Sequence, residues 1–310
     1  HCPHCKYSIP WYLNVPLLTW LYLRGKCANC KAPISFRYFL VELLTGLLFL
    51  AAWLSFGRQS VGVALVYCLI LAGFVVATFI DFEHFIIPDE ITIGGIAAGF
   101  LASFLVPALH GVTNVTDAMK ESFLGILVGG GLVYGILRLG KLLFGKQKLA
   151  LEPGSKVLFT ETAVKLPDLE VPYEELFYRK SDAILFNAKQ LEMIDRCYCN
   201  VSVRLSPEKL QIGEDEFNPE QTPCLEVIVD EITVPREAMG FGDVKFMAAI
   251  GAFLGWQATI FSLMVSSIIG ALVGVGLIAM GKREWSSRLP YGPYIALAAV
   301  IWMFWGYRIF

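Results

Sequence analysis

The sequence has 310 residues, 56% of them apolar, and a mean hydropathy of +0.59. Soluble globular domains are usually about 45–50% apolar, so a wholly soluble protein is excluded. The net charge of −2 hides a split, because residues 146–238 contain 11 Lys/Arg and 18 Asp/Glu and sum to −7, while the other residues sum to +5.

The chain begins with two Cys-x-x-Cys motifs separated by 21 residues, formed by Cys2, Cys5, Cys27 and Cys30. Two chelating pairs at this spacing predict a structural zinc site with four thiolate ligands. Two disulfides or free thiols are the alternatives, and a reducing cytoplasm disfavours disulfides. His1 and His4 are not included as ligands, because adjacent ligands rarely fit a tetrahedral site. A module of this size would gain its folding energy from the metal.

Apolar blocks close to the roughly 20 residues that span a bilayer follow the module. The predicted membrane helices are Phe36–Phe56, Val61–Ile80, Ile91–His110, Ser122–Phe144, Trp256–Met280 and Tyr291–Phe310. The first 37 residues contain five Lys/Arg and no acid, so the positive-inside rule places them in the cytoplasm. Threading the helices from there puts loop 81–90 and residues 146–240 on the cytoplasmic side as well.

Five acids lie in or near the first predicted membrane helices. Asp81 follows the helix predicted to end at Ile80, and Asp89 is expected to cap the next helix. Glu42 lies inside the first predicted helix, where a carboxylate is a functional candidate, although pairing with Arg37 near the interface is the simpler interpretation. Glu83 and Glu90 are interpreted as solvated loop charges.

Residues 146–238 form a soluble insert between two membrane segments. The stretches "CYCNVSVRLS" and "CLEVIVDEITV" alternate as strands do, which predicts a β-rich domain. No phosphate loop, nucleophile elbow or basic stripe is visible, so we expect no nucleic-acid partner. Cys197, Cys199 and Cys224 have a spacing that only weakly indicates a second metal site, and Cys68 is interpreted as a buried, inert thiol.

A short apolar block, Val244–Leu254, follows the insert. The 13 residues from Val244 to Trp256 reach about 20 Å as a helix, against a hydrocarbon core of about 30 Å. Length alone indicates a re-entrant segment. A full crossing is favoured because it returns the basic loop with Lys282, Arg283 and Arg288 to the cytoplasm, and it gives about seven transmembrane helices.

The stretch "GFGD" places Asp243 after Gly240 and Gly242, at the cytoplasmic end of the short block. Asp81 is expected at the same depth. Two nearby carboxylates share a proton, and one can activate water while the other polarises a carbonyl, as in aspartic proteolysis. The glycines would let backbone approach a bound peptide. The residues alone equally allow Asp243 to be a helix N-cap or first-turn acid.

Several motifs in combination resemble the bifunctional type IV prepilin peptidases, the leader peptidase/N-methyltransferases of the GxGD intramembrane aspartic protease class. They are the cysteine module running into "LRGKCANCKAPISFRYFLVELLTGLLF", then "IDFEHFIIPDEIT", "GFGDVKFMAAIGAFLGWQ" and "LPYGPYIALAA". The resemblance implies that Asp81 and Asp243 are the catalytic pair. It also implies cleavage of the leader of type IV prepilin or pseudopilin precursors after a glycine, at the cytoplasmic face of the bacterial inner membrane.

The resemblance further implies transfer of a methyl group from S-adenosylmethionine to the new N-terminus, within type IV pilus or type II secretion assembly. No nucleotide-type glycine loop indicates where the methyl donor binds. Members of the family normally have a further transmembrane helix before the cysteine module, which would bring the number to eight. They also have a short connection before "GFGD", where this sequence has about 90 residues.

The expected protein is an all-α polytopic membrane protein with a four-cysteine zinc module and a β-rich cytoplasmic insert. Its expected parts are residues 1–35 (zinc module), 36–145 (membrane helices with Asp81), 146–238 (insert) and 239–310 (membrane helices with "GFGD"). Besides the peptidase, two other functions are open. One is a transporter that uses intramembrane carboxylates, and the other is a non-enzymatic platform for pilus or secretion assembly.

Overall fold

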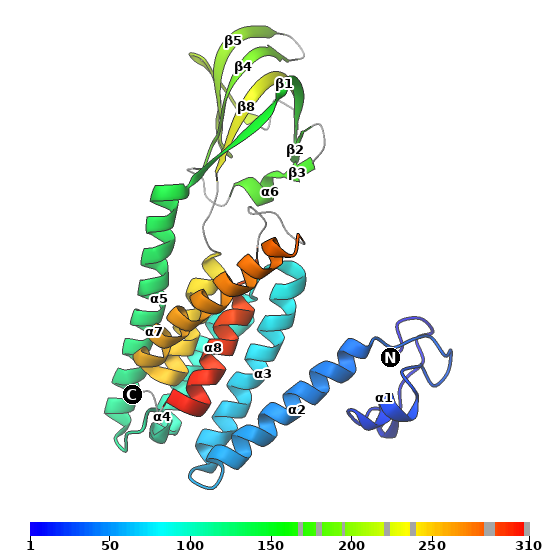
Figure 1. Cartoon of the computed structure of the whole chain (residues 1–310), viewed down its shortest axis with the longest axis vertical. Coiled ribbons are helices and arrows are strands. Elements are labelled where there is room, and N and C mark those ends of the chain that lie inside the picture. The colour runs from blue at the N-terminus through cyan, green and yellow to red at the C-terminus, as the bar shows by residue number, and fades with distance from the viewer. Residues whose placement is uncertain are drawn as a thin grey trace. The chain divides into compact units, whose positions relative to one another are not determined.

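The structure, a computed structural model, describes residues 1–166, 170–177, 182–193, 196–219, 224–235, 240–281 and 289–306. The basic loop residues Lys282, Arg283 and Arg288 lie outside this part of the chain, as do the last four residues of the predicted final helix. The chain forms two compact units (Figure 1). One is His1–Tyr134 with Phe241–Phe310, and the other is Gly135–Gly240.

The first unit is helical. Its elements are η1 (Trp11–Leu13), α1 (Leu18–Tyr22), α2 (Phe36–Phe56), α3 (Val61–His84), α4 (Asp89–Leu105), η2 (Pro107–His110), α5 (Val115–Phe144, which continues into the second unit), α7 (Phe241–Ala279) and α8 (Gly292–Trp305). Among the described residues, four helices are long and apolar enough to cross a membrane, namely α2, α3, α5 and α7. The predicted class of polytopic membrane protein agrees with this, but the number of about seven is not confirmed.

Part of the difference in number lies in α7, where the predicted short block and the next predicted helix are joined, and the other two predicted spans are the shorter helices α4 and α8, of 17 and 14 residues. Gly255 interrupts this helix with φ +81°, a left-handed conformation that favours glycine. The first half of α7 runs beside α4, from the ion pair between Lys245 and Asp89 to the contact of Ala252 with Gly99. The second half returns, since Gly274 lies against Leu289, just before α8. The first half of α7 therefore lies alongside α4.

Serine side chains stabilise the bend. The carbonyl oxygen of Ala252, three residues before Gly255, accepts hydrogen bonds from Ser122 Oγ at 2.8 Å and Ser103 Oγ at 3.3 Å. Both serines are fully buried. Ser103 Oγ also lies 2.8 Å from His110 Nε2. An unpaired carbonyl in an apolar setting costs free energy, so these bonds fix the position where the helix turns back.

Small residues let the backbones of α5 and α7 touch. A Cβ atom on Gly125 would lie 2.1 Å from the carbonyl oxygen of Gly251, and one on Gly129 would lie 2.4 Å from that of Met247. Such close approach is typical of membrane helix pairs, which associate through packing because lipid gives no hydrophobic driving force. The first half of α7, including Phe246, Met247 and Ile250, is almost completely buried by these contacts.

The second unit is an eight-stranded antiparallel sheet with strand order β3-β2-β1-β8-β4-β5-β6-β7. The strands are β1 (Lys146–Thr160), β2 (Ala163–Lys165), β3 (Glu170–Pro172), β4 (Ile184–Glu192), β5 (Cys197–Leu205), β6 (Leu210–Ile212), β7 (Asp215–Phe217) and β8 (Cys224–Pro235), with a short helix α6 (Tyr173–Leu176). The two predicted strand segments correspond to β5 and β8, so the β-rich insert is confirmed. Lys146 pairs with Pro235, so the insert leaves and rejoins the chain at neighbouring points.

Alternating apolar residues form one hydrophobic core in this sheet. Ile184, Phe186 and Ala188 on β4 and Leu225, Val227 and Val229 on β8 are buried, at the period of two expected for a sheet with one covered face. Phe159 and Phe186 stack with ring centroids 5.1 Å apart. This core gives the insert its own source of stability.

Three interpretations of the early acids need correction. α3 continues to His84, so Asp81 lies in its last turn and not in a loop. Glu83 pairs with Arg37, whereas it was expected to be a solvated loop charge. Glu42 was expected to pair with Arg37, but its carboxylate accepts a hydrogen bond from the backbone N–H of Leu17 at 2.9 Å.

The contact of α5 with α7 yields a stability prediction. Gly125→Ala should destabilise the protein by about 1–3 kcal/mol, because a methyl group would collide with the backbone of α7. The matched control is Gly131→Ala on the same helix, where no atom lies within 4 Å of the added Cβ, and alanine should be neutral or stabilising. Thermal unfolding of both variants in detergent measures the difference, and equal melting temperatures would contradict the close packing.

Candidate active site and metal centre

Asp81 is held at the C-terminal end of α3 by the start of α8. Its side chain is buried, with 5% of the residue exposed, and Oδ2 accepts a hydrogen bond from the backbone N–H of Gly292 at 2.9 Å. The first N–H groups of a helix have no partner within the helix. One of them therefore stabilises the carboxylate from a point 211 residues away along the chain.

Glycine is required at position 292 by the close approach of Asp81. A Cβ there would lie 2.9 Å from Asp81 Oδ2 and 3.1 Å from Ile87 Cδ1. The preceding residue, Tyr291, is anchored to α7, because its hydroxyl lies 2.9 Å from both Ser266 Oγ and Ser267 Oγ. These contacts fix the N–H of Gly292 relative to Asp81.

Asp243 lies in the first turn of α7, as the capping interpretation expected, and there it stabilises the helix dipole. It is nevertheless buried, with 8% exposed, unlike an ordinary surface cap. The residue before it, Gly242, faces Ile87, since a Cβ on Gly242 would lie 3.6 Å from Ile87 Cβ. Gly240 is exposed just before the helix.

Ile87 links the two acids. It is 5% exposed and contacts both Gly242, which precedes Asp243, and Gly292, which binds Asp81. The C-terminal end of α3 and the N-terminal end of α7 lie at the same end of the helical unit (Figure 1). One side chain therefore lies between Gly242, the residue before Asp243, and Gly292, which binds Asp81.

Other charges surround this end of the unit. Asp89, expected as a cap, lies in the first turn of α4 without a side-chain capping bond, and it pairs with Lys245. Arg37 pairs with Glu83, and its Nη2 donates to the carbonyl oxygen of Phe79 at 3.2 Å. Asp89 and Glu83 at this end of the unit are therefore both ion-paired.

Sequence reasoning missed Ile87, Tyr291 and Gly292. The signal was present in the stretch "LPYGPYIALAA", where Gly-Pro opens an apolar block. Proline at the first positions of a helix is common, so the pattern predicts a helix start. It does not reveal which side chain that start would bind.

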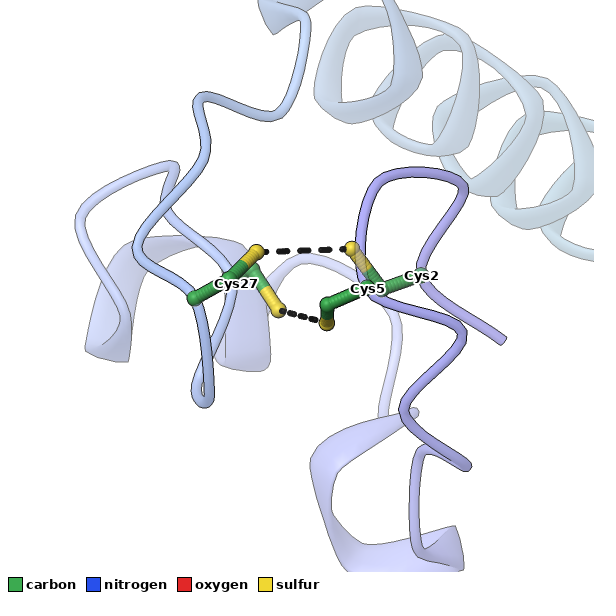
Figure 2. A group of neighbouring side chains, drawn as sticks. Cys2, Cys5 and Cys27 are labelled. Carbon is green, nitrogen blue, oxygen red and sulfur yellow. Dashed lines mark hydrogen bonds between the residues drawn. The ribbon is translucent and has the colours of Figure 1, made fainter.

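The four cysteines of the N-terminal module come together as predicted. Their Sγ atoms all lie within 4.8 Å of one another. Figure 2 shows the thiols facing each other in two pairs, with Cys2 Sγ 3.8 Å from Cys30 Sγ and Cys5 Sγ 4.0 Å from Cys27 Sγ. The described residues contain no other such cluster. Cys197, Cys199 and Cys224 are exposed, and Cys68 is half-buried.

Both Cys-x-x-Cys motifs fold into the same turn. Cys2 exchanges backbone hydrogen bonds with Tyr7 and Lys6, and Cys27 does so with Ala32 and Lys31. Lys6 and Lys31 take positive φ values of 54° and 59°, a conformation that is uncommon outside glycine. The repeated, strained turn points each pair of sulfur atoms at the other pair.

The thiols interact electrostatically. A backbone hydrogen bond from Tyr7, with side-chain hydrogen bonds from Cys30 and Asn29, lowers the pKa of Cys5 to about 6. For Cys30, the backbone hydrogen bond from Ala32 lowers the pKa, but desolvation and the thiols of Cys5, Cys27 and Cys2 raise it to about 11. Four thiolates cannot form together without a cation among them, so the cluster is suited to hold a metal ion.

Comparison with known proteins gives the family. The family described as "Bacterial Peptidase A24 N-terminal domain" matches residues 1–56, and the "Type IV leader peptidase family" matches residues 68–152 and 226–275. A curated prepilin leader peptidase/N-methyltransferase of Aeromonas hydrophila is 30% identical over 98% of this chain and 71% of its own length. The chain belongs to the type IV leader peptidase family.

Other relatives in the family agree. A prepilin leader peptidase/N-methyltransferase of Pseudomonas aeruginosa is 24% identical over 99% of this chain and 72% of its own length. One of Myxococcus xanthus is 42% identical over 41% of this chain and 35% of its own length. No solved structure matches the chain. The matched segments contain the four cysteines, Asp81 and Asp243, whereas most of the β-sheet insert lies between them.

The cluster predicts a bound metal. The purified full-length chain should contain about one divalent metal ion, and Cys27→Ser should remove it, because a tetrahedral structural site uses all four thiolates. Cys68→Ser is the control and should keep the metal, since Cys68 lies in α3 outside the cluster. Elemental analysis of the three proteins measures the metal, and equal content in all three would contradict the site.

Proposed function

We propose that this chain is an intramembrane aspartic endopeptidase that removes the leader of type IV prepilin-like precursors and N-methylates the new N-terminus. The observation that carries the proposal is that Ile87 joins the surroundings of two buried carboxylates, Asp81 and Asp243. The names of the relatives, prepilin leader peptidase/N-methyltransferase in Aeromonas hydrophila and type 4 prepilin-like proteins leader peptide-processing enzyme in Escherichia coli, support the substrate.

The proposed mechanism uses the two aspartates as base and acid. The ionised carboxylate takes a proton from a water molecule, which attacks the scissile carbonyl, while the protonated carboxylate donates a hydrogen bond to the carbonyl oxygen. The acid then protonates the leaving amine, and no covalent intermediate forms. The N–H of Gly292 would hold Asp81 in place during these transfers. Gly240 and Gly242 would leave room for the substrate backbone next to Asp243.

We place this site at the cytoplasmic face of the bacterial inner membrane. The five cations and absence of acids in residues 1–37 support a cytoplasmic N-terminal module. With the two halves of α7 each crossing, and with α4 and α8 crossing beside them, the chain would span the membrane about seven times. The module (residues 1–35), the two helical parts (36–145 and 239–310) and the insert (146–238) would then be its domains, with the insert in the cytoplasm.

We assign zinc to the cysteine cluster. Tetrahedral Zn²⁺ with Zn–S bonds of about 2.3 Å separates its sulfur ligands by about 3.8 Å. The Sγ–Sγ distances of 3.8 Å and 4.0 Å match that separation, and all four sulfur atoms lie within 4.8 Å of one another. Four protein ligands would close the site, which supports a structural role in holding the module together.

S-adenosylmethionine would supply the methyl group in the second reaction. The names of the relatives support this activity. The proposed sequence of events requires cleavage first, because methylation needs the newly released amine. Prepilin or pseudopilin precursors would enter sideways from the lipid as apolar helices.

The first prediction of the proposal concerns the acids. Asp81→Asn and Asp243→Asn should each reduce precursor cleavage by at least about 10²-fold, because an amide cannot exchange the proton. The matched control is Asp89→Asn, which changes an acid at the same end of the unit that pairs with Lys245. A gel assay of precursor processing by the full chain in lipid nanodiscs measures the rates.

The outcome separates three functions. Normal processing by both asparagine variants would overturn the peptidase assignment. Normal processing with impaired flux would favour a carboxylate-based transporter. Normal processing with normal pilus or secretion assembly would favour a platform role. Methylation of an already cleaved substrate should continue in both variants, and this result shows that the fold is intact.

The second prediction concerns Gly292 as a positioning residue. Gly292→Ala should lower the cleavage rate by about 10²-fold, because a misplaced catalytic group loses its alignment. It should lower kcat with little change in KM, because the N–H of Gly292 positions Asp81 and does not bind the substrate. Gly276→Ala, where no atom lies within 4 Å of the added Cβ, is the control.

A milder variant addresses the same contact. Tyr291→Phe removes only the hydroxyl that contacts Ser266 and Ser267, so it should give a smaller loss of kcat, again with little change in KM. Loss of rate in Gly292→Ala and Tyr291→Phe that follows only the loss of folded protein, with kcat per folded molecule unchanged, would show a merely structural role.

A further inference from the structure

The outer surface of the N-terminal module is unusually apolar. Trp11 is 84% exposed and Tyr22 is 80% exposed, and Tyr12, Leu18 and Leu21 are also exposed. Leu18, Leu21 and Tyr22 lie three and four residues apart, so they share one face of α1. Trp11 and Tyr12 are adjacent in η1, with ring centroids 6.0 Å apart. Large exposed apolar patches mark surfaces that contact a partner or a membrane.

The positive charge of the N-terminal module favours an anionic partner for this surface. Lys6, Arg24, Lys26, Lys31 and Arg37 are the charged side chains among the first 37 residues, which contain no acid; of these cations, Arg37 pairs with Glu83 in α3. Aromatic residues with basic neighbours are typical of segments at the membrane interface, where rings sit among headgroups and cations bind anionic lipids. Exposing the aromatic and aliphatic side chains of this surface to water would cost free energy.

Contacts with α2 place α1 beside the entry of that helix into the membrane. Trp20, on the opposite face of α1, packs on Phe36 and Phe39, with ring centroids 5.5 Å and 5.1 Å away. The backbone N–H of Leu17 donates to Glu42, in the second turn of α2. The module therefore folds back along the first two turns of a helix that is long and apolar enough to span a bilayer.

We propose that the η1–α1 surface, formed by Trp11, Tyr12, Leu18, Leu21 and Tyr22, lies in the headgroup region of an anionic lipid bilayer. The apolar side chains enter the boundary of the acyl chains, and the module's cations contact lipid phosphates. A metal ion bound by the four cysteines would cross-link the module and so hold this surface rigid against the end of α2. The inference depends on α2 crossing the membrane and is independent of the peptidase chemistry.

The experiment uses the full-length chain in lipid nanodiscs. The chain has seven tryptophans, so the fluorescence of wild type minus that of Trp11→Phe isolates the emission of Trp11. The expected result is a blue-shifted emission that lipids with brominated acyl chains quench and aqueous iodide does not. Trp53, which is half-exposed on α2, provides the reference for a lipid-facing ring through the matched variant Trp53→Phe.

A second arm tests the lipid charge. In discs containing phosphatidylglycerol, the double variant Arg24→Gln/Lys26→Gln should increase the iodide quenching of Trp11, because fewer cations hold the module on the surface. Lys209→Gln, an exposed change in the β-sheet unit that pairs with Glu216, should leave it unchanged. Wild type should show stronger iodide quenching in neutral phosphatidylcholine discs than in anionic discs.

Two outcomes would overturn the inference. Strong iodide quenching without bromolipid quenching would show that the surface faces water. Protection from both quenchers would show that a protein surface covers Trp11, such as a second copy of the chain. Metal content of each variant confirms that the module is folded, so a failed variant cannot be mistaken for a negative result.

Discussion

The bend at Gly255 is the constraint on which the rest of the helical unit depends. It turns α7 back, so that its second half returns toward the end where its first half began. Tyr291 can then reach Ser266 and Ser267 on that second half, and Gly292 can reach Asp81. The bend is stable because Ser103 and Ser122 bind the carbonyl oxygen of Ala252, which would otherwise be unpaired in an apolar interior.

The two acids show how a membrane protein retains a costly group. A buried carboxylate in a membrane segment is expensive and is usually functional. Here the free-energy cost of burying the Asp81 carboxylate is offset by a hydrogen bond from the backbone N–H of Gly292, at the start of α8. Asp243 lies at the N-terminal end of α7, where the helix dipole favours a negative charge. Both acids are buried at the same end of the helical unit (Figure 1).

The chain adds two parts to this core by different physical means. The β-sheet unit has its own hydrophobic core, and its first and last strands pair at Lys146 and Pro235, so a long insertion between α5 and α7 costs little loop entropy. The N-terminal module lacks such a core. Its strained turns bring four thiols together in a cluster that could hold a metal ion, and several of its large apolar residues are exposed.

The sequence by itself determined the membrane class, the cysteine cluster, the strands of the insert and the two acids that we propose as catalytic. Each of these depends on a local signal, namely hydropathy, ligand spacing, alternation or a charge at the edge of an apolar block. Only the tertiary structure decided that Gly292 binds Asp81, that Ile87 joins the two acids, that Arg37 pairs with Glu83, and that α7 is one bent helix. These are contacts between residues far apart in the chain, and their partners are fixed by helix packing, which local sequence patterns do not specify.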